Sequence, residues 1–301
     1  MEQGKKIRNS LGIHDGIFHA DEVTAAAFLV LSGLVNRDNI VRTRDVEKLA
    51  RCEFVCDVGG VYNPQKKLFD HHQADYKGDL SSAGMILLYL QERKIISEEE
   101  YKMFNNSLVI GIDAHDNGKA PQEVGYSSFS HVIANFTPIS YSITPEEIDS
   151  HFFEALSFVE GHLHRLKKRY EYNVACRKIV ATSMAQCHTC LFFDKMIPWQ
   201  ESFFALGGKE HPALFIIMPA GEHWKLRAIP PDYEHRMQVR LPLPEKWAGL
   251  LEEDLKKVTG LPGAVFCHKG RFTSVWQTKE EAILALKMVL IMNGIPYENT
   301  F

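Results

Sequence analysis

The sequence lacks the features of membrane, secreted and broadly basic proteins. No apolar run among its 301 residues approaches the length of about 20 that a membrane-spanning helix needs. The first residues, MEQGKKIRNSLGIHDG, carry charges but no long apolar core, so they do not look like a signal peptide. The formal net charge is −4, so any contact with nucleic acid must be a local patch. We therefore expect a cytoplasmic protein that binds no membrane.

Cysteines are few and show no framework for disulfides. Without a secretory signal, we expect the six cysteines to be reduced thiols. Cys187 and Cys190 form a CxxC, but a structural zinc site needs a second pair of ligands. Only Cys176 and the Cys267-His268 pair could supply it, and they are scattered. We predict packed cysteines rather than a zinc or redox centre.

The first half of the chain predicts strands that alternate with helices. The composition, 45% hydrophobic and 24% charged, is that of an ordinary globular protein, and the length suggests about two domains. Apolar runs predict strands over residues 11–13, 40–43, 54–58 and 68–69. Helical patterns begin at Asp21-Glu22, Ser81 and Glu98. This alternation favours an α/β fold with a parallel sheet.

A long helix is expected to connect the two halves. In Thr144-Pro145-Glu146-Glu147, Thr can cap the helix, Pro suits its first position, and Glu follows three residues after the cap. The helix should run from about residue 145 to about residue 175. We place the metal-binding catalytic domain, with this connector, at residues 1–185 and a C-terminal substrate-binding domain at residues 186–301.

The second half predicts a smaller mixed α/β domain. Its β-like runs are separated by turns, which indicates an antiparallel component. They are CLFFD, ALFIIM, WKLRAI, AVFCH and RFTSVWQ. Helical patterns occur in EEDLKKVTG and in KEEAILALKMVLIMN.

Four groups of His and Asp in the first 116 residues indicate a metal site. They are His14, His19 and Asp21; Asp57; Asp70-His71-His72; and Asp113 with Asp116. Most follow an apolar run that predicts a buried strand, and the carboxyl ends of parallel strands meet at one edge of a sheet. A single Asp at such a place is more often a turn or cap residue. The coincidence of four groups favours metal ligation.

His and carboxylate ligands suit two divalent ions that act on phosphate esters. We expect Mn²⁺, with Mg²⁺ or Zn²⁺ as alternatives. Asp57 precedes Gly59-Gly60 and is the natural bridge between the ions, because glycines keep the pocket open. The predicted metal ligands are His14, His19, Asp21, Asp57, His71 and Asp113, with Asp116 in reserve. Asp57 and His72 are the predicted catalytic residues, since His72 is free to donate a proton.

The order of these motifs resembles that of the DHH phosphoesterases. It is closest to the Myg (melanocyte proliferating gene) family, whose members are similar to DHH-type RNA exonucleases. The resemblance covers nearly the whole chain, in GIHDGIFHADEVTAAA, VRTRD, CDVGGVYNPQKKLFDHHQ, IDAHDNG, WKLRAIP, RLPLPEKWAGL and LPGAVFCHKGRF. It implies a DHH phosphoesterase domain with a parallel sheet, and a metal-dependent 3′–5′ exonuclease acting on RNA or short oligonucleotides.

The family pattern also implies a division of the ligands. One ion would be held by His14, His19 and Asp57, and the other by Asp21, Asp57, His71 and Asp113. His72 would face the scissile phosphate. His19 stands where many DHH enzymes have Asp, which favours manganese or zinc over magnesium. Ser274-Val275 stands where the family has a glycine pair in a loop expected to approach the substrate.

Three charged residues of the second half are predicted to bind substrate. His268, Lys269 and Arg271 could bind a phosphate or a terminal nucleotide, although a solvated charged turn is the alternative. Two other functions stay open. One is a hydrolase of a small substrate, such as a dinucleotide, cyclic dinucleotide or phosphomonoester. The other is a non-catalytic binding protein with a relic metal site. Both a monomer and a homo-oligomer are compatible with the sequence.

Overall fold

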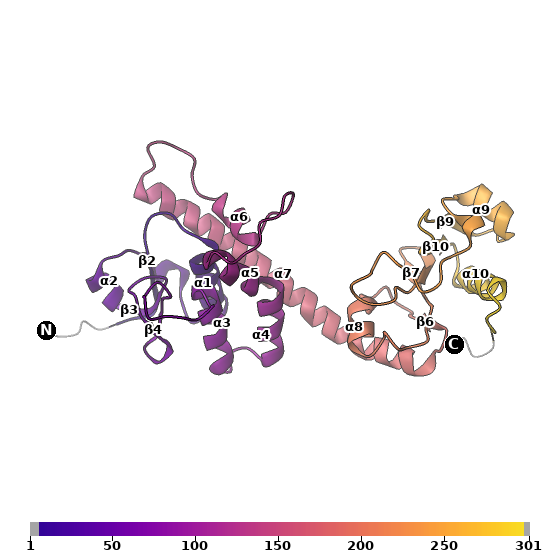
Figure 1. Cartoon of the computed structure of the whole chain (residues 1–301), viewed down its shortest axis with the longest axis horizontal. Helices are drawn as coiled ribbons and strands as arrows, with labels where there is room; N and C mark the ends of the chain where they lie inside the picture. The colour runs from indigo at the N-terminus through magenta and orange to yellow at the C-terminus, as the bar shows by residue number, and fades with distance from the viewer. Residues whose placement is uncertain (1–5, 298–301) are drawn as a thin grey trace. The chain divides into compact units, whose positions relative to one another are not determined.

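The computed structural model describes residues 6–297, which fold into two units (Figure 1). The division falls between Arg169 and Tyr170, inside the long helix α7 (Pro145–Gln186). Each unit contains one five-stranded sheet. Within residues 6–297, none of the helices combines the length and the apolar character that a membrane crossing requires.

The sheet of the first unit is mainly parallel, as the sequence predicted. Its strands are β1 (Ile7–Ile13), β2 (Ile40–Arg42), β3 (Cys52–Cys56), β4 (Tyr62–Asn63) and β5 (Leu68–Phe69). The spatial order is β2-β1-β3-β5-β4, and only β4 runs antiparallel to its neighbour. The chain proceeds from β1 to one side and then crosses to β3 on the other. The carboxyl ends of β1 and β3 therefore flank a switch point of the kind where α/β sheets bind ligands.

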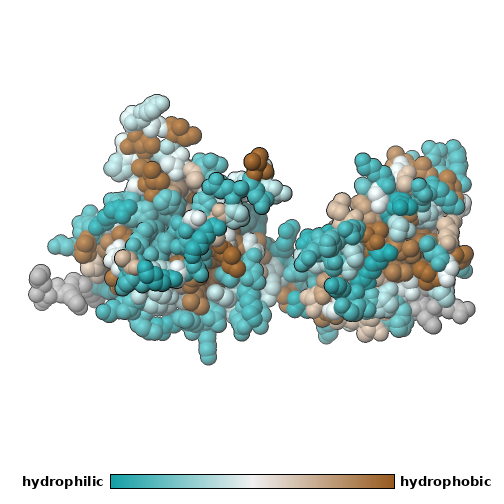
Figure 2. Space-filling model, viewed as in Figure 1, coloured by the Kyte–Doolittle hydropathy of each residue, from teal (hydrophilic) through white to brown (hydrophobic). Residues whose placement is uncertain are grey.

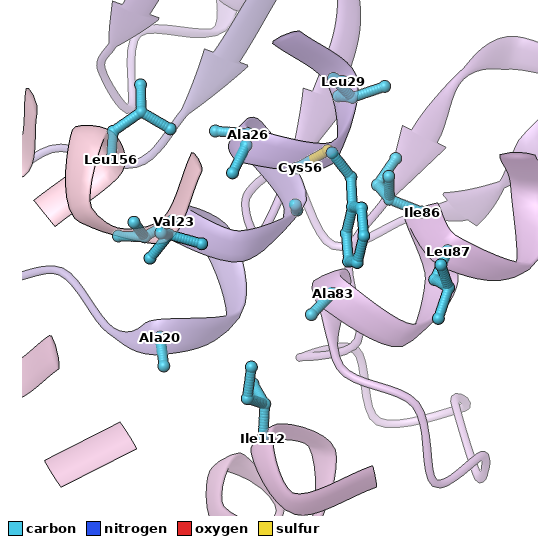
Figure 3. Packing of buried hydrophobic residues seen from close by; sticks show 14 of the residues in the cluster. Ala20, Val23, Ala26, Leu29, Cys56, Ala83, Ile86, Leu87, Ile112 and Leu156 are labelled. Atoms are coloured by element: carbon cyan, nitrogen blue, oxygen red, sulfur yellow. The ribbon is translucent and has the colours of Figure 1, made fainter. Parts of the chain in front are cut away.

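Helices cover both faces of this sheet. The larger layer consists of α1 (Ala20–Leu31), α3 (Ser82–Glu92), α4 (Glu98–Phe104), α5 (Ile110–Asp116), α6 (Phe129–Ala134) and the first part of α7. Figure 3 shows small residues of α1, such as Ala26, packed among side chains of α3 and β3. Alternate residues of β3 face opposite sides, so Phe54 enters this core while Val55 packs against Leu49 of α2 (Val46–Ala50).

The segment that carries Asp113 and Asp116 is helical rather than the end of a strand. Residues 105–109 form a π-helical turn that joins α4 to α5, and both carboxylates lie on α5. Of the apolar run VIGI, Val109 and Ile112 are buried at helical spacing, whereas Ile110 between them is exposed. The expectation that most ligand groups follow strands is wrong for this one.

The second unit is the smaller mixed α/β fold that the sequence predicted. Its strands are β6 (Cys190–Phe192), β7 (Phe215–Ala220), β8 (His223–Ala228), β9 (Ala264–Cys267) and β10 (Thr273–Trp276), in the order β6-β7-β8-β10-β9. Only β6 and β7 pair in parallel. The helices α9 (Glu252–Thr259) and α10 (Lys279–Met292) occur where expected, whereas the short α8 (Trp199–Ala205) was not predicted.

The serine expected in a substrate loop lies inside the second sheet. Ser274 and Val275 belong to β10, between β8 and β9. Ser274 is fully buried, and its Oγ accepts a hydrogen bond of 2.9 Å from Nε1 of Trp276. The loop expectation for this pair is therefore wrong, and Ser274 serves the packing of the sheet.

The surface in Figure 2 is largely hydrophilic, with hydrophobic side chains in patches. One patch lies on the loop between α6 and α7, a segment that contains the fully exposed Ile139. The six cysteines are buried and unpaired, which agrees with packed thiols.

Candidate metal centre

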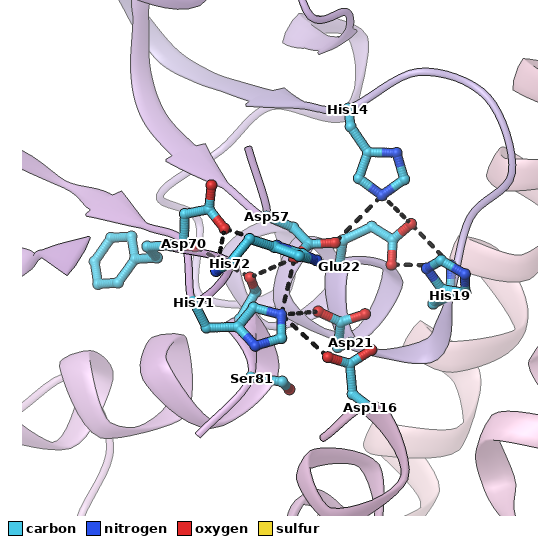
Figure 4. A network of polar contacts seen from close by, with 12 residues as sticks. His14, His19, Asp21, Glu22, Asp57, Asp70, His71, His72, Ser81 and Asp116 are labelled. Carbon is cyan, nitrogen blue, oxygen red and sulfur yellow. Dashed lines mark hydrogen bonds and ion pairs between the residues drawn. The ribbon is translucent and has the colours of Figure 1, made fainter. Parts of the chain in front are cut away.

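Five of the six predicted ligands, all but Asp113, gather at the carboxyl edge of the first sheet (Figure 4). His14 follows β1, Asp57 follows β3, and Asp70-His71-His72 follows β5. Helix α1 starts directly after His19 and brings Asp21 and Glu22 to the same place. The helix α5 adds Asp116 from the opposite side. The side chains that follow the strands, together with His19 and Asp116, line a cavity of about 1150 Å³.

Asp57 lies at the centre of this arrangement. Its Oδ2 is 3.2 Å from Nε2 of His14, and its Oδ1 is 3.3 Å from Nε2 of His71. Its backbone φ of 58° lies in the left-handed region, which is uncommon for Asp and typical of strained functional positions. Gly59 and Gly60 continue the turn with φ of 99° and 67°. A Cβ on either would meet nothing within 4 Å, so backbone conformation rather than space requires these glycines.

The first ligand group comprises His14, His19, Glu22 and Asp57, with one donor atom of each within 4.8 Å of the others. Nδ1 of His14 is 2.9 Å from the Asp15 carbonyl oxygen, which leaves Nε2 to face the site. Nε2 of His14 is 3.1 Å from Oε1 of Glu22. Sequence reasoning did not single out Glu22. Its signal was its place in the capping box of α1, where both carboxylate oxygens accept from the His19 backbone N–H at 2.8 and 2.9 Å.

The second group forms around His71. Its Nε2 lies 3.0 Å from Oδ2 of Asp116, 3.3 Å from Oδ1 of Asp57 and 3.9 Å from Oδ2 of Asp21. Both carboxylate oxygens of Asp21 are buried and accept no hydrogen bond from the described residues. A buried carboxylate without a hydrogen-bond donor is costly unless a cation binds it. Three carboxylates and an imidazole are a donor set that suits a divalent ion, so these residues fit a metal.

Crowding of the carboxylates shifts the pKa values at this site. Burial lowers the pKa of His14, but hydrogen bonds to Asp57 and Glu22 outweigh it and raise the value to about 10. Burial is likewise outweighed at His71, where Asp116 and Asp57 raise the pKa to about 10. Burial, with the nearby charge of Asp57, holds the pKa of Asp21 well above its usual range. The protonated imidazoles thus balance negative charge that a divalent cation would neutralise.

Asp113 has a different place from the one predicted. Its Oδ1 accepts hydrogen bonds from the backbone N–H of Ser81 at 3.0 Å, from Oγ of Ser81 at 2.7 Å and from the N–H of Gly84 at 3.2 Å. These groups form the first turn of α3, whose orphan N–H groups need acceptors. A Cβ at Gly84 would lie 2.3 Å from Oδ2 of Asp113, so only glycine permits the approach. Asp113 belongs to neither ligand group, whereas Asp116, one helical turn further, lies 3.0 Å from His71 and also groups with His19 and Asp21.

His72 is 64% exposed at its side chain, and its Nδ1 lies 3.5 Å from Oδ1 of Asp57, so it also groups with Asp57 and His71 as a possible metal ligand. Its Nδ1 lies 2.9 Å from Oδ1 of Asp70, and its backbone N–H donates to the same oxygen at 3.1 Å. Oδ2 of Asp70 accepts from the N–H of Gly60 at 2.5 Å. Asp70 therefore orients the imidazole of His72 and leaves its Nε2 free at the cavity.

The three predicted substrate residues of the second unit share one hairpin. His268, Lys269 and Arg271 lie between β9 and β10. The N–H of Arg271 donates to the carbonyl of His268 at 2.8 Å, and Arg271 adopts a φ of 57°. The Gly270 N–H donates to Nδ1 of His268 at 2.9 Å. The turn thus has a defined structure with Lys269 exposed at its tip.

Comparisons with known proteins give one consistent family. The family model MYG1_exonuc, described as an uncharacterised protein family (UPF0160), matches residues 10–290. The MYG1 protein of Chlamydia muridarum is 49% identical over 290 residues, which cover 96% of this chain and 99% of that protein. The MYG1 exonuclease of Homo sapiens is 31% identical over 324 residues, which cover 93% of this chain and 85% of that protein.

Solved structures of RecJ show only a weak similarity. The complex with Mn²⁺ from Thermus thermophilus has a TM-score of 0.28 and 14% identity, over 95% of this chain and 52% of that chain. An exonuclease RecJ bound to manganese has a TM-score of 0.30 and 14% identity, over 100% of this chain and 92% of that chain. Similarity at this level bears on neither the fold nor the activity of this chain.

Proposed function

The chain belongs to the MYG1_exonuc family, and from that premise we propose a divalent-metal-dependent phosphodiesterase, a 3′–5′ exonuclease acting on RNA or short oligonucleotides. The observation that carries the proposal is the position of Asp57. Its two carboxylate oxygens face different ligand groups, as a bridge between two ions requires. The names of relatives such as the human MYG1 exonuclease support the reaction class.

The proposed ligands follow from the distances. His14, His19 and Asp57, with Glu22 beside them, would hold one ion. Asp21, Asp57, His71 and Asp116 would hold the other. We propose Asp116 in place of Asp113, because the Asp113 carboxylate is engaged with the first turn of α3. We propose Mn²⁺ as the ion, with Mg²⁺ or Zn²⁺ as alternatives, since imidazole ligands suit the softer ions.

The side chains around these ligands define the remaining roles. When bound, two divalent ions would activate a water for in-line attack on phosphorus and neutralise charge on the phosphoryl oxygens. His72 would donate a hydrogen bond to a phosphate oxygen or protonate the leaving oxygen, because its side chain is 64% exposed and its ring is held through Nδ1 by Asp70. Asp57 would hold the two ligand groups together, because its two carboxylate oxygens face one group each.

The second unit is proposed to bind substrate. His268, Lys269 and Arg271 offer cationic and hydrogen-bonding groups on one hairpin, suited to a phosphate or a terminal nucleotide. In this division of roles, residues 1–185 would bind the metal ions and carry out the reaction, and residues 186–301 would supply affinity for the substrate.

A degradation assay with two labels tests both activity and direction. The purified protein, loaded with Mn²⁺, is given an oligoribonucleotide labelled at its 5′ end or at its 3′ end. A 3′–5′ exonuclease produces a ladder from the first and a labelled mononucleotide from the second. Chelation should abolish the reaction, and added Mn²⁺ should restore it. Turnover of a dinucleotide or a phosphomonoester without any ladder would instead identify a small-molecule hydrolase.

A further inference from the structure

The segment VRTRD lies beside the metal centre and has no role so far. Strand β2 ends at Arg42, and Asp45 caps α2, its carboxylate accepting from the N–H groups of Glu47 and Lys48. The two arginines of this segment, Arg42 and Arg44, differ in their exposure to solvent. The first is buried and the second is exposed, with side chains 2% and 65% accessible.

Arg42 serves the structure of the ligand loop. Its guanidinium pairs with Asp149 of α7 and donates to the carbonyl of Gly16, both at 2.5 Å. It also lies over the ring of Phe152, 4.8 Å from the centroid. Gly16 is in the loop that carries His14 and His19. Arg42 therefore fixes this loop against α7, and it is not among the residues that line the cavity.

Arg44 faces the cavity instead. Among the described residues that line it, Arg44 is the one Lys or Arg, and the others include the ligands His14, Asp57, His71 and Asp116. Its ionic partner within residues 6–297 is Asp15, with Nε 3.3 Å from Oδ1. The Asp15 side chain is 54% exposed. A solvated pair of this kind contributes little to stability, so the guanidinium can exchange Asp15 for a stronger partner.

We infer that Arg44 binds a phosphate of the substrate next to the scissile one. This rests on the proposed function, in which the scissile phosphate must reach the buried ligands around Asp57. Arg44 lies at the exposed rim of the same cavity, so it meets a phosphate further along the chain. A guanidinium binds phosphate through two parallel hydrogen bonds. Its contact with Asp15 is a single one, from Nε to Oδ1. The site therefore selects substrates with at least two phosphates, such as oligonucleotides, over monoesters and isolated diesters.

A binding experiment tests the anchor without turnover. Fluorescence anisotropy is measured with a labelled phosphorothioate oligonucleotide that resists hydrolysis, in Mn²⁺, for the parent protein and for Arg44→Met. We expect affinity to fall roughly tenfold to a hundredfold, the usual effect of losing a charge-assisted contact. The slope of log K against log salt should decrease in magnitude by about 0.7, the value for one phosphate on a single strand. The matched control is Arg51→Met, which removes another exposed arginine of the same unit outside the cavity. It should change neither the affinity nor the salt slope.

A comparison of two substrates then separates anchoring from catalysis. With an oligoribonucleotide, Arg44→Met should raise KM by a similar factor at nearly constant kcat, and Arg44→Lys should fall between the two proteins. With bis-p-nitrophenyl phosphate, which has a single phosphate, turnover should not change. Metal content measured by mass spectrometry should stay at the parent value.

Each outcome decides the inference. Equal losses on both substrates, or loss of metal, would show that Arg44 supports the metal centre and would overturn the anchor. Unchanged oligonucleotide affinity in Arg44→Met would overturn it as well. If the parent binds the oligonucleotide through Arg44 but degrades none, the anchor stands and the proposed exonuclease function fails.

Discussion

Replacing Asp113 and Asp116 separately distinguishes a structural carboxylate from a metal ligand. In Asp113→Ala, the buried N–H groups of Ser81 and Gly84 lose their acceptor, as does Oγ of Ser81. An unsatisfied buried donor costs about 1–3 kcal/mol, and loss of an N-terminal helix cap costs about 1 kcal/mol. Because these terms overlap, we expect the free energy of unfolding to fall by about 3 kcal/mol.

Asp116→Ala should behave in the opposite way. Its side chain is 19% exposed, and its recorded polar contact is with Nε2 of His71. We expect the metal-free protein to lose less stability than in Asp113→Ala, because His71 keeps Asp57 as a partner at 3.3 Å and the charge of Asp116 no longer crowds Asp21. The affinity for one of the two ions should fall by about a hundredfold or more, since loss of a mere supporting group already costs 10- to 100-fold.

Two measurements on each variant check this pair. Urea unfolding with chelator gives the stability of the metal-free fold, and titration with Mn²⁺ gives the number and affinity of bound ions. Gly84→Ala is a useful third variant, because its Cβ would displace the Asp113 carboxylate from α3. It should reproduce the stability loss of Asp113→Ala. If Asp113→Ala lost one ion at unchanged unfolding free energy, Asp113 would be the ligand and our placement of Asp116 would be wrong.

Three further predictions concern the same centre. Asp57→Ala should remove most activity and loosen both ions, because its two oxygens face the two ligand groups; two tightly bound Mn²⁺ ions with normal turnover would refute the bridge. His72→Ala should retain both ions and lower kcat roughly a hundredfold or more, whereas loss of an ion would make His72 a ligand. His14 and His71 have pKa values of about 10 without metal but must be neutral as ligands. Metal loading at pH 7 should therefore release at least two protons, and the affinity for the metal should increase as pH rises. Calorimetry in buffers of different ionisation heat measures the number of protons, and a value near zero contradicts the reasoning.

Local signals were enough to predict much of the fold and part of the centre. An apolar run followed by His or Asp identifies the end of a buried strand, and this placed His14, Asp57 and Asp70 correctly at the sheet edge. Helix α7 was predicted from its cap and its Pro145, although it extends to Gln186 rather than about residue 175. The α8 helix has only seven residues, too few for a periodic pattern.

The remaining features depend on packing between segments. Asp113 and Asp116 lie one turn apart on α5, and the choice between them follows from how the helix is rotated against α3. Glu22 carries a visible capping signal, but its second contact with His14 appears only in three dimensions. The partner of Ser274 is Trp276 on the same strand, which no sequence spacing identifies as a hydrogen bond.

Helix α7 contributes residues to two hydrophobic cores, and the stretch between these residues is largely exposed to solvent. Val159 and Leu163 pack in the first core, and Cys176 and Val180 pack in another core of the second unit. From 164 to 175 no residue is buried, and the core contact that this stretch makes is that of the partly buried Leu166. A free helix of such length is only marginally stable in water. Trypsin, which cuts after Lys and Arg, should therefore cleave here first, because four of its sites fall within residues 165–169, and each fragment should keep its own core.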